Sequence, residues 1–225
     1  MLKSLKKLFF IKNENLNENK NLRDKFSQIY ANNIFGGKDS RSGEGSNMKQ
    51  TAEIRHELPK LIEELGITSF MDAPCGDFFW MKETPLGVEH YIGIDIVDTL
   101  IEDNLRQFGN SSTNFLCLNL AESDLPKTDL IFCRDCLVHL TFEDANKIIS
   151  NFKRSGAKYL LTTTFTERTS NTDLVGSDIW RPLNLRLAPF NFPKPLRLID
   201  EKCSEYHGKF SDKHLGLWLL DEIIP

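Results

Sequence analysis

The stretch SFMDAPCGDFFWM at residues 69–81 and the stretch YIGIDIV at residues 91–97 decide the fold. The first holds an apolar run that ends in Asp72 and is followed by Gly76, which permits a tight turn and a close approach of a ligand to the backbone. The second is apolar up to Asp95. We therefore predict a strand–turn–helix–strand unit whose polar residues lie at the carboxyl ends of both strands.

The same alternation continues on both sides of this unit. Strand-like runs occupy residues 68–72, 89–95, 114–118, 129–133 and 158–164, and helical stretches occupy residues 46–65, 78–83, 99–108 and 141–155. Two later runs, 196–199 and 215–220, have no helix between them and predict an antiparallel hairpin at the sheet edge. Pro59 predicts a kink, or two abutting helices, in the first helical stretch. Apolar strands that alternate with helices predict an α/β fold with a doubly wound, mostly parallel sheet.

The composition favours one globular domain in a reducing compartment. The chain has 225 residues, of which 40% are hydrophobic, enough to bury a sizeable core. The formal net charge is −4 and the body of the chain shows no basic stripe, so we expect no nucleic-acid partner. The five cysteines lie mostly in apolar runs and no export signal is evident, which favours the cytoplasm. The oligomeric state stays open, a homodimer included.

The N-terminal segment differs from the rest of the chain. Residues 1–12, MLKSLKKLFFIK, contain four lysines and no acids, with apolar residues at helical spacing. A basic amphipathic helix here would make a weak contact with the inner face of a membrane; the alternatives are docking on its own domain or a partner chain, or a frayed end. Residues 13–21 read as a polar linker, so we divide the chain into residues 1–21 and a single domain at residues 22–225. No window of 18 apolar residues occurs, so no membrane-spanning helix is predicted.

The end of the second strand indicates the ligand. In a doubly wound sheet, ligands bind beyond the carboxyl ends of the strands, and a carboxylate at Asp95 can accept hydrogen bonds from both hydroxyls of a ribose. A dinucleotide is disfavoured because the first strand is not followed by the full G-x-G-x-x-G pattern. A Walker A loop is rejected in the glycine-rich segment 35–46, because Lys38 is followed by Asp39 and no strand precedes it. We predict an adenosine cofactor.

The turn after the first strand resembles the glycine motif of class I S-adenosylmethionine-dependent methyltransferases, with Pro74 and Asp77 at the first and third glycine-type positions. A carboxylate in place of a glycine suits a cofactor with an ammonium and a sulfonium rather than two phosphates. The blocks FGGKDSRSGEGS, TAEIRHELPKLI, PCGDFFWM, YIGIDIV, CRDCLVHL, YLLTTTF, WRPLNL and HLGLWLL are similar, in the same order, to those of one bacterial subgroup of small-molecule and glycan type. The resemblance covers residues 35–221 and implies a seven-stranded sheet with a reversed last strand. It also implies S-adenosylmethionine as cofactor and S-adenosylhomocysteine as product.

The same resemblance assigns the cofactor-binding residues. Along the methionine part it implies Asp72, Cys75 and Gly76. It implies Asp95 at the ribose, Asn119 and Leu120 at the adenine, and the backbone carbonyl of Arg134 at the amino group. A cap of the turn is the alternative for the first carboxylate, and a packing role is the alternative for the thiol. The full predicted set is Asp72, Ala73, Pro74, Cys75, Gly76, Asp77, Asp95, Ile96, Asn119, Leu120 and Arg134.

A hydroxyl acceptor would need a base to remove its proton. His139 is the candidate, because it lies just beyond the fourth strand and an unperturbed histidine titrates near about 6.5. Asp135 is expected to orient that ring or to bind the acceptor. The alternative is that His139 packs under the helix that begins at Thr141. We expect no metal, because no clear carboxylate cluster is present and the pair Cys133 and Cys136 lacks the two further ligands of a zinc site.

Two segments are expected to select the acceptor. The glycine-rich segment 35–46 should be mobile or wrapped over the site, and residues 167–195 form a long irregular stretch of a kind that is usually functional or disordered. Within the second segment we predict acceptor contacts from Trp180 as an aromatic wall, Arg181 as an anion clamp and Asn184 as an amide.

Together these features predict an S-adenosylmethionine-dependent methyltransferase that O-methylates a small polar molecule. A sugar or nucleotide-linked sugar of surface glycans is the expected acceptor, and this class comes from the resemblance alone. One alternative is N-methylation of a small amine, which would need less of a base. Another is a cofactor-binding subunit that has lost catalysis and regulates a partner.

Overall fold

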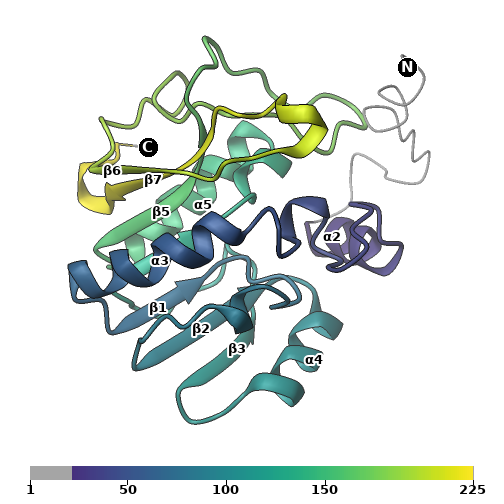
Figure 1. Cartoon of the computed structure of the whole chain (residues 1–225). Helices are drawn as coiled ribbons and strands as arrows, with labels where there is room; N and C mark the ends of the chain where they lie inside the picture. Colours follow the sequence, from purple (N-terminus) through teal and green to yellow (C-terminus); the bar gives the residue numbers. More distant parts are fainter. Residues whose placement is uncertain (1–21, 225) are drawn as a thin grey trace.

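Seven strands form one sheet within residues 22–224, the part of the chain that the computed structural model describes. The strands are β1 (Ser69–Asp72), β2 (His90–Asp95), β3 (Thr113–Cys117), β4 (Leu130–Cys133), β5 (Tyr159–Phe165), β6 (Arg197–Asp200) and β7 (Lys213–Leu219). Their order across the sheet is β3-β2-β1-β4-β5-β7-β6 (Figure 1). The first five strands pair in parallel, and β7 is antiparallel to both β5 and β6. The predicted α/β fold, with a mostly parallel seven-stranded sheet and a reversed last strand, is confirmed.

Helices cover both faces of this sheet. The α-helices of the described part are α2 (Leu22–Ala31), α3 (Ala52–Leu65), α4 (Asp98–Phe108) and α5 (Phe142–Arg154). One core cluster joins α3 and α4 to alternate strand residues such as Phe70, and the other joins α5 to residues such as Met71. Figure 1 shows α3 and α5 on opposite sides of the strands. Successive strand residues thus pack against helices on opposite faces of the sheet, and this is the doubly wound arrangement.

The strand order places a switch point between β1 and β4. From β1 the chain moves outward to β2 and β3, and it then returns to β4 on the other side of β1. The connections that leave β1 and β4 therefore diverge at their carboxyl ends. A crevice forms at such a point, and it is where ligands bind in open α/β sheets.

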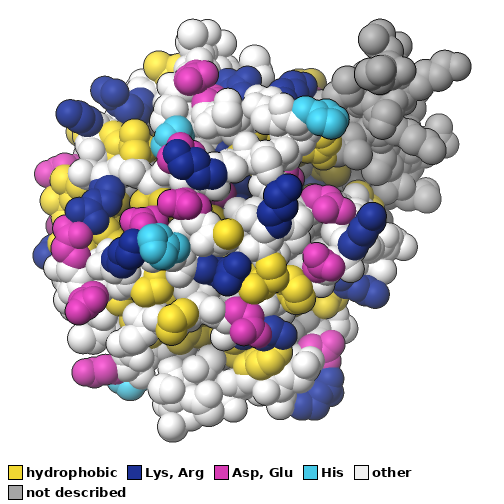
Figure 2. Space-filling view, in the orientation of Figure 1, with side chains coloured by type: hydrophobic (Ala, Val, Ile, Leu, Met, Phe, Trp, Pro, Cys, Tyr) yellow, Lys and Arg dark blue, Asp and Glu magenta, His cyan; other side chains and the backbone are white. Residues whose placement is uncertain are grey.

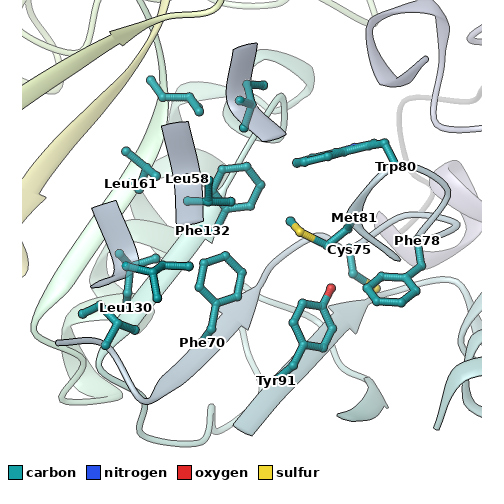
Figure 3. Packing of buried hydrophobic residues seen from close by; sticks show 14 of the residues in the cluster. Leu58, Phe70, Cys75, Phe78, Trp80, Met81, Tyr91, Leu130, Phe132 and Leu161 are labelled. Carbon is teal, nitrogen blue, oxygen red and sulfur yellow. The ribbon is translucent and has the colours of Figure 1, made fainter. Parts of the chain in front are cut away.

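The prediction of a helix over residues 78–83 is wrong. A 3-10 turn at Met81–Glu83 is the regular element there, and Phe78 has a left-handed backbone with φ of 56°. Burial explains the difference, because the Phe78 ring packs 5.1 Å from the rings of both Tyr91 and Phe115 while Trp80 and Met81 are buried nearby (Figure 3). Side chains that enter the core from successive positions cannot share one face of a helix.

The first helical stretch starts later than residue 46. The side-chain oxygen of Asn47 accepts hydrogen bonds from the amides of Lys49 and Gln50, and this local turn delays the start of α3 to Ala52. Helix α3 is a single uninterrupted element that contains Pro59, so the expectation of two abutting helices is wrong. The end predicted at residue 65 is confirmed, and Gly66 caps α3 with a left-handed backbone at φ of 63°.

The predicted start, at Thr141, of the helix over residues 141–155 is confirmed by a capping hydrogen bond. The Thr141 hydroxyl accepts a hydrogen bond from the Asp144 amide at 3.1 Å. The buried side chains of α5 recur at helical spacing and pack on the second core cluster: Ala145, Ile148, Ile149 and Phe152.

Residues 167–195 cross the sheet end without a helix or strand, as expected. Phe190 and Phe192 are buried, and the Phe192 ring lies 5.3 Å from that of Trp218 on β7. The segment is thus packed on the core. On the face drawn in Figure 2, basic and acidic side chains are interspersed.

No helix among residues 22–224 is long and apolar enough to cross a membrane. The predicted basic helix at residues 1–12 lies outside the described residues.

Candidate active site

A cavity of about 1130 Å³, its open mouth included, lies where the carboxyl ends of β1, β2 and β4 meet. All of the predicted cofactor residues except Ala73 line it: Asp72, Pro74, Cys75, Gly76, Asp77, Asp95, Ile96, Asn119, Leu120 and Arg134. The predicted catalytic residues His139 and Asp135 line it too. The fold therefore brings the predicted cofactor residues and the predicted base to one cavity.

The turn after β1 is tied to its neighbours through Gly76. Its amide donates a hydrogen bond to Asp95 Oδ2 at 3.2 Å, and its carbonyl accepts one from the buried side chain of Asn104 at 2.8 Å. Gly76 has φ of 53°, and a Cβ at this position would lie 2.2 Å from the Ser42 hydroxyl oxygen. Only glycine fits this backbone and this close approach.

Asp95 is a buried carboxylate that still has hydrogen-bonding capacity. Oδ1 accepts from the amide of Val97 at 3.1 Å and Oδ2 accepts from the amide of Gly76. Burial raises the pKa of Asp95 to about 6, although the backbone amides oppose this. Each carboxylate oxygen has two lone pairs, so both oxygens can accept one further hydrogen bond from a ribose hydroxyl.

Asp72 faces the same cavity in a drier environment. It is 3% exposed, and the Tyr91 hydroxyl donates a hydrogen bond to its Oδ2 at 2.6 Å. Burial raises the pKa of Asp72 to about 8, although the bond from Tyr91 lowers it. A cationic ligand beside this carboxylate would restore its ionised form, so the position suits a ligand with a positive charge.

Asp77 anchors the glycine-rich segment 35–46 over the turn. Its Oδ1 accepts a hydrogen bond from the Ser40 hydroxyl at 2.8 Å, and its Oδ2 accepts one from the Arg41 amide at 2.8 Å. The conformation of this segment requires glycine at position 37, because a Cβ there would lie 1.9 Å from the Ser40 carbonyl oxygen. A third glycine in place of Asp77 would lack these bonds.

Helix α2 forms part of the cavity wall, although none of its residues was predicted to belong to the site. Phe26, Ile29 and Tyr30 line the cavity together with Leu22. The Arg41 guanidinium lies 5.4 Å from the centre of the Tyr30 ring, so α2 and the glycine-rich segment also contact each other. The apolar spacing of α2 was visible in the sequence, and the surface that it covers was not.

Two apolar side chains lie in the part of the cavity that is predicted to hold the adenine. Ile96 and Leu120 line it. The Asn119 side chain is used locally, because its Oδ1 accepts from the Ala121 amide at 3.0 Å and its Nδ2 donates to Glu122 at 3.0 Å. These bonds fix the chain direction after β3.

His139 is held with one ring nitrogen committed. Nδ1 lies 2.6 Å from the carbonyl oxygen of Ile179, so in the neutral ring this nitrogen carries the proton and Nε2 carries the lone pair. The ring lies 4.6 Å from that of Phe35 in the glycine-rich segment. Burial lowers the pKa of His139 to about 4, so the ring is neutral near pH 7 and can accept a proton.

Asp135 does not orient the His139 ring, and that part of the prediction is wrong. Its Oδ2 accepts a hydrogen bond from Lys213 Nζ at 2.6 Å and lies 3.3 Å from the Arg134 guanidinium. Burial opposes ionisation, but the charges of Lys213 and Arg134 outweigh it and lower the pKa of Asp135 to about 2. The other part of the prediction, an acceptor contact from Asp135, is compatible with its place on the cavity wall.

Arg181 has a structural role in place of the predicted anion clamp. Its guanidinium donates to the carbonyls of Leu137 at 2.8 Å and Leu140 at 2.6 Å, and the side chain is buried away from the cavity lining. These bonds hold the 3-10 turn at Leu137–His139, which carries the candidate base. A guanidinium whose donors are taken by backbone carbonyls cannot clamp an anion.

Trp180 and Asn184 also lie outside the cavity lining. The Trp180 ring packs 4.9 Å from that of Phe210. The Asn184 amide donates to the Arg168 carbonyl at 2.9 Å. The geometry corrects all three predicted acceptor contacts, because these side chains stabilise the long segment that contains them.

One group of described residues has the spacing of metal ligands. The ligand atoms of Glu53, His56 and Glu57 on α3 lie within 4.8 Å of one another, and none of these residues lines the cavity.

Comparisons with known proteins agree on the fold. Neither a protein-family model nor a curated protein sequence matches the chain. Among solved structures, the 1,6-didemethyltoxoflavin-N1-methyltransferase of Burkholderia thailandensis has a TM-score of 0.56 at 16% identity, over 87% of this chain and 85% of that one. The N-methyltransferase NodS of Bradyrhizobium japonicum has a TM-score of 0.55 at 13% identity, over 78% and 98%. An S-adenosylmethionine-dependent methyltransferase of Clostridium acetobutylicum has a TM-score of 0.53 at 13% identity, over 88% and 98%.

The strand order with its reversed β7 and the cavity at the switch point agree with these likenesses. The chain has the fold of the class I S-adenosylmethionine-dependent methyltransferases.

Proposed function

We propose that this protein is an S-adenosylmethionine-dependent methyltransferase. The observation that carries the proposal is a single cavity that contains the backbone turn at Gly76, the buried carboxylates Asp95 and Asp72, and the ring of His139. The fold likeness is consistent with this assignment and does not by itself establish an activity.

The residues present fit the cofactor. Gly76 allows its backbone to be approached closely, Asp95 has acceptor capacity for two ribose hydroxyls, and Asp72 gains from a cation such as the methionine ammonium. Asp77 would hold the glycine-rich segment 35–46 over the bound molecule. When bound, S-adenosylmethionine supplies a methyl group that its sulfonium has already activated.

The remaining work of the protein is to align the acceptor, exclude water and take up a proton. The glycine-rich segment 35–46, called the covering segment below, closes one side of the cavity together with α2. This restricts the entry of water. His139 has its lone pair on Nε2 and can take the proton of an acceptor hydroxyl as the new bond to carbon forms. We therefore propose O-methylation of a small polar molecule, with a sugar or nucleotide-linked sugar as the acceptor class suggested by the resemblance.

N-methylation of a small amine is the second candidate, because one observation favours it. Three carboxylates, Asp135, Glu201 and Glu205, interact with two cations, Arg134 and Lys213, beside the cavity wall. An ammonium would be attracted there and would need to lose a proton before it reacts.

Methyl transfer can be tested directly. The protein is incubated with S-adenosylmethionine that carries a labelled methyl group, with separate panels of polyols, sugars and amines. The proposal predicts labelled product and S-adenosylhomocysteine in at least one panel, and the chemical shift of the labelled methyl group distinguishes attachment to oxygen from attachment to nitrogen. Binding of the cofactor without turnover in any panel would favour the regulatory subunit instead.

A further inference from the structure

The candidate base is contacted by side chains from both elements that cover the cavity. Lys25, on α2, donates a hydrogen bond from Nζ to the backbone carbonyl of His139 at 3.2 Å. Phe35, at the start of the covering segment, packs its ring 4.6 Å from the His139 ring, with 36° between the ring planes. Neither side chain was assigned a role from the sequence.

Lys25 completes the anchoring of the 3-10 turn that carries His139. From the long segment, Arg181 binds the carbonyls of Leu137 and Leu140 at 2.8 and 2.6 Å. The carbonyl of His139 lies between these two in the chain and is bound from α2 instead. The backbone of the turn is therefore held by two cations, and one of them belongs to an element that covers the cavity.

The position of Phe35 depends on the conformation of the covering segment. A Cβ on Gly43 would lie 3.2 Å from the Cβ of Phe35, so two parts of the segment are in close contact. Between them, the segment is anchored on the Asp77 carboxylate by two hydrogen bonds of 2.8 Å. The ring that packs on His139 is thus fixed by the same segment that is anchored on the turn after β1.

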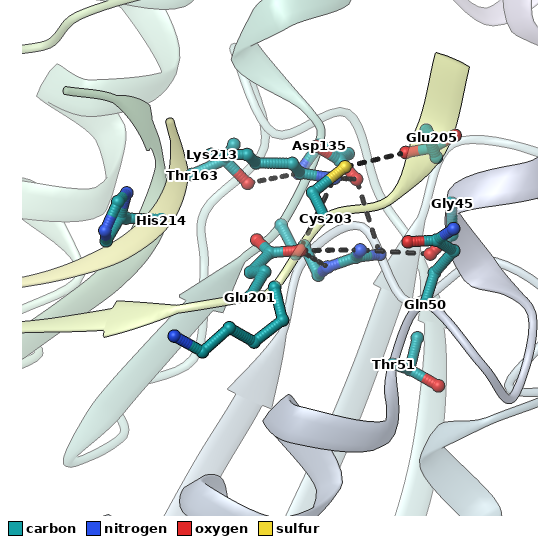
Figure 4. A network of polar contacts seen from close by, with 12 residues as sticks. Gly45, Gln50, Thr51, Asp135, Thr163, Glu201, Cys203, Glu205, Lys213 and His214 are labelled. Carbon is teal, nitrogen blue, oxygen red and sulfur yellow. Dashed lines mark hydrogen bonds and ion pairs between the residues drawn. The ribbon is translucent and has the colours of Figure 1, made fainter. Parts of the chain in front are cut away.

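The surroundings of the imidazole set its proton affinity. Burial is the main reason why the pKa of His139 lies at about 4, and the hydrogen bond to the Ile179 carbonyl opposes it. Charged groups act as well, because Asp135 raises the pKa of His139 whereas Lys25 and Lys213 lower it. Asp135 and Lys213 form an ion pair at 2.6 Å, so their opposite effects partly cancel (Figure 4). The charge of Lys25 therefore has an effect of its own on the ring.

We propose that Lys25 and Phe35 are positioning residues for His139, which hold its imidazole so that Nε2 is available to the methyl acceptor. Nδ1 is committed to the Ile179 carbonyl, so a ring that cannot rotate presents a single nitrogen to the acceptor hydroxyl. The base is then complete only while α2 and the covering segment are closed over the cavity. This role rests on the proposed methyltransferase function.

The test follows the imidazole signals of the full, ligand-free chain by NMR while the pH is lowered from about 8 to about 3.5. His139→Ala identifies the His139 signal by its loss. In wild type this signal should stay that of a neutral ring until the pH approaches about 4. The other four of the five histidines are internal standards, because unchanged midpoints for them show that a variant is folded.

Lys25→Met should raise the midpoint of the His139 titration by about half a pH unit, because a nearby positive charge is lost. Phe35→Ala should raise it by about one pH unit, because water then reaches the ring, and should also speed the exchange of the Nδ1 proton with solvent. Lys25→Arg keeps a cation that can bind the same carbonyl and should restore the wild-type titration. Lys38→Met, at an exposed lysine of the covering segment, is the matched control and should leave the midpoint unchanged.

An unchanged or lowered His139 midpoint in Lys25→Met or in Phe35→Ala would overturn the inference. Equal solvent exchange of the Nδ1 proton in wild type and Phe35→Ala would overturn it as well. Failure of the proposed function is distinguishable, because wild type would then show no binding in a separate titration with S-adenosylhomocysteine, whatever the His139 midpoints are.

Discussion

The proposed cofactor half and the proposed acceptor half of the cavity are held in different ways. In the cofactor half, the carboxylates of Asp95 and Asp77 are fixed largely by backbone amides and hydroxyls of the turn and its covering segment. In the acceptor half, Asp135 is fixed by Lys213, which lies 78 residues away on β7. The bonds of the first half join residues 2 to 37 positions apart, whereas the ion pair of the second half joins residues 78 positions apart and depends on β7 lying beside β5.

The difference has an energetic side. The ion pair between Lys213 and Glu201 is shielded from solvent, since Lys213 is 4% exposed and Glu201 is 2% exposed. Removing one partner of a buried pair leaves an uncompensated charge. Removing Lys213 from this half should therefore lower stability, whereas removing the Asp95 carboxylate from the cofactor half should mainly lower ligand affinity.

Lys213→Met should cause the largest loss of stability. It removes a cation that lies 2.6 Å from Asp135 and 3.5 Å from Glu201, and these two carboxylates then share Arg134 alone. We expect the free energy of unfolding to fall by about 3–5 kcal/mol, measured by urea denaturation. Lys202→Met is the control, because it makes the same substitution at an exposed lysine. Equal stability of the two variants would contradict the buried ion-pair account.

His139→Ala should slow methyl transfer and leave cofactor affinity unchanged. The imidazole lines the cavity, and general bases contribute about 10²–10⁴-fold to rate. Because burial lowers the pKa of His139 to about 4, it is a weak base and a loss near about 10²-fold is expected for O-methylation. The affinity for S-adenosylhomocysteine should not change. Turnover equal to wild type with a hydroxyl acceptor would remove His139 as the base.

Asp72→Asn should alter how stability depends on pH in the ligand-free protein. Burial raises the pKa of Asp72 to about 8, above its unfolded value near about 4, so the folded state binds more protons between these pH values. The contribution of Asp72 to the free energy of unfolding is therefore present at low pH and is lost as pH rises to about 8.

The asparagine variant keeps an acceptor for the Tyr91 hydroxyl but cannot titrate. Its free energy of unfolding should fall less steeply between about pH 4 and 8 than that of wild type, as measured by denaturation at several pH values. Asp124→Asn changes an exposed aspartate and should reproduce the wild-type slope. An unchanged slope in the Asp72 variant would show that this carboxyl is ionised in the folded state at low pH.

The same contrast explains what could be predicted from the sequence. The strands and the carboxylates Asp72 and Asp95 follow from local patterns of apolar runs that end in polar residues. The glycine at position 76 marks a turn for a backbone reason that is also local. Periodicity therefore predicted the fold, and the family resemblance supplied most of the predicted cofactor residues that line the cavity.

Side-chain partners far apart in the chain were not predictable in this way. The sequence of the long segment suggested that Arg181 clamps an anion, but carbonyls of Leu137 and Leu140 take its donors. The pairing of Asp135 with Lys213 depends on β7 lying beside β5. Tertiary burial likewise overrode the helical pattern at Phe78.

The central claim is that the cavity holds S-adenosylmethionine with Asp95 at the ribose. Isothermal titration of the full chain with S-adenosylhomocysteine tests it, with Asp95→Asn compared with the exposed control Asp124→Asn. We predict one binding site in wild type and in the control, and a loss of about 1.5–3 kcal/mol of binding free energy in Asp95→Asn, which removes charged acceptors for the ribose hydroxyls. No binding to wild type, or equal affinities in all three proteins, would contradict the account.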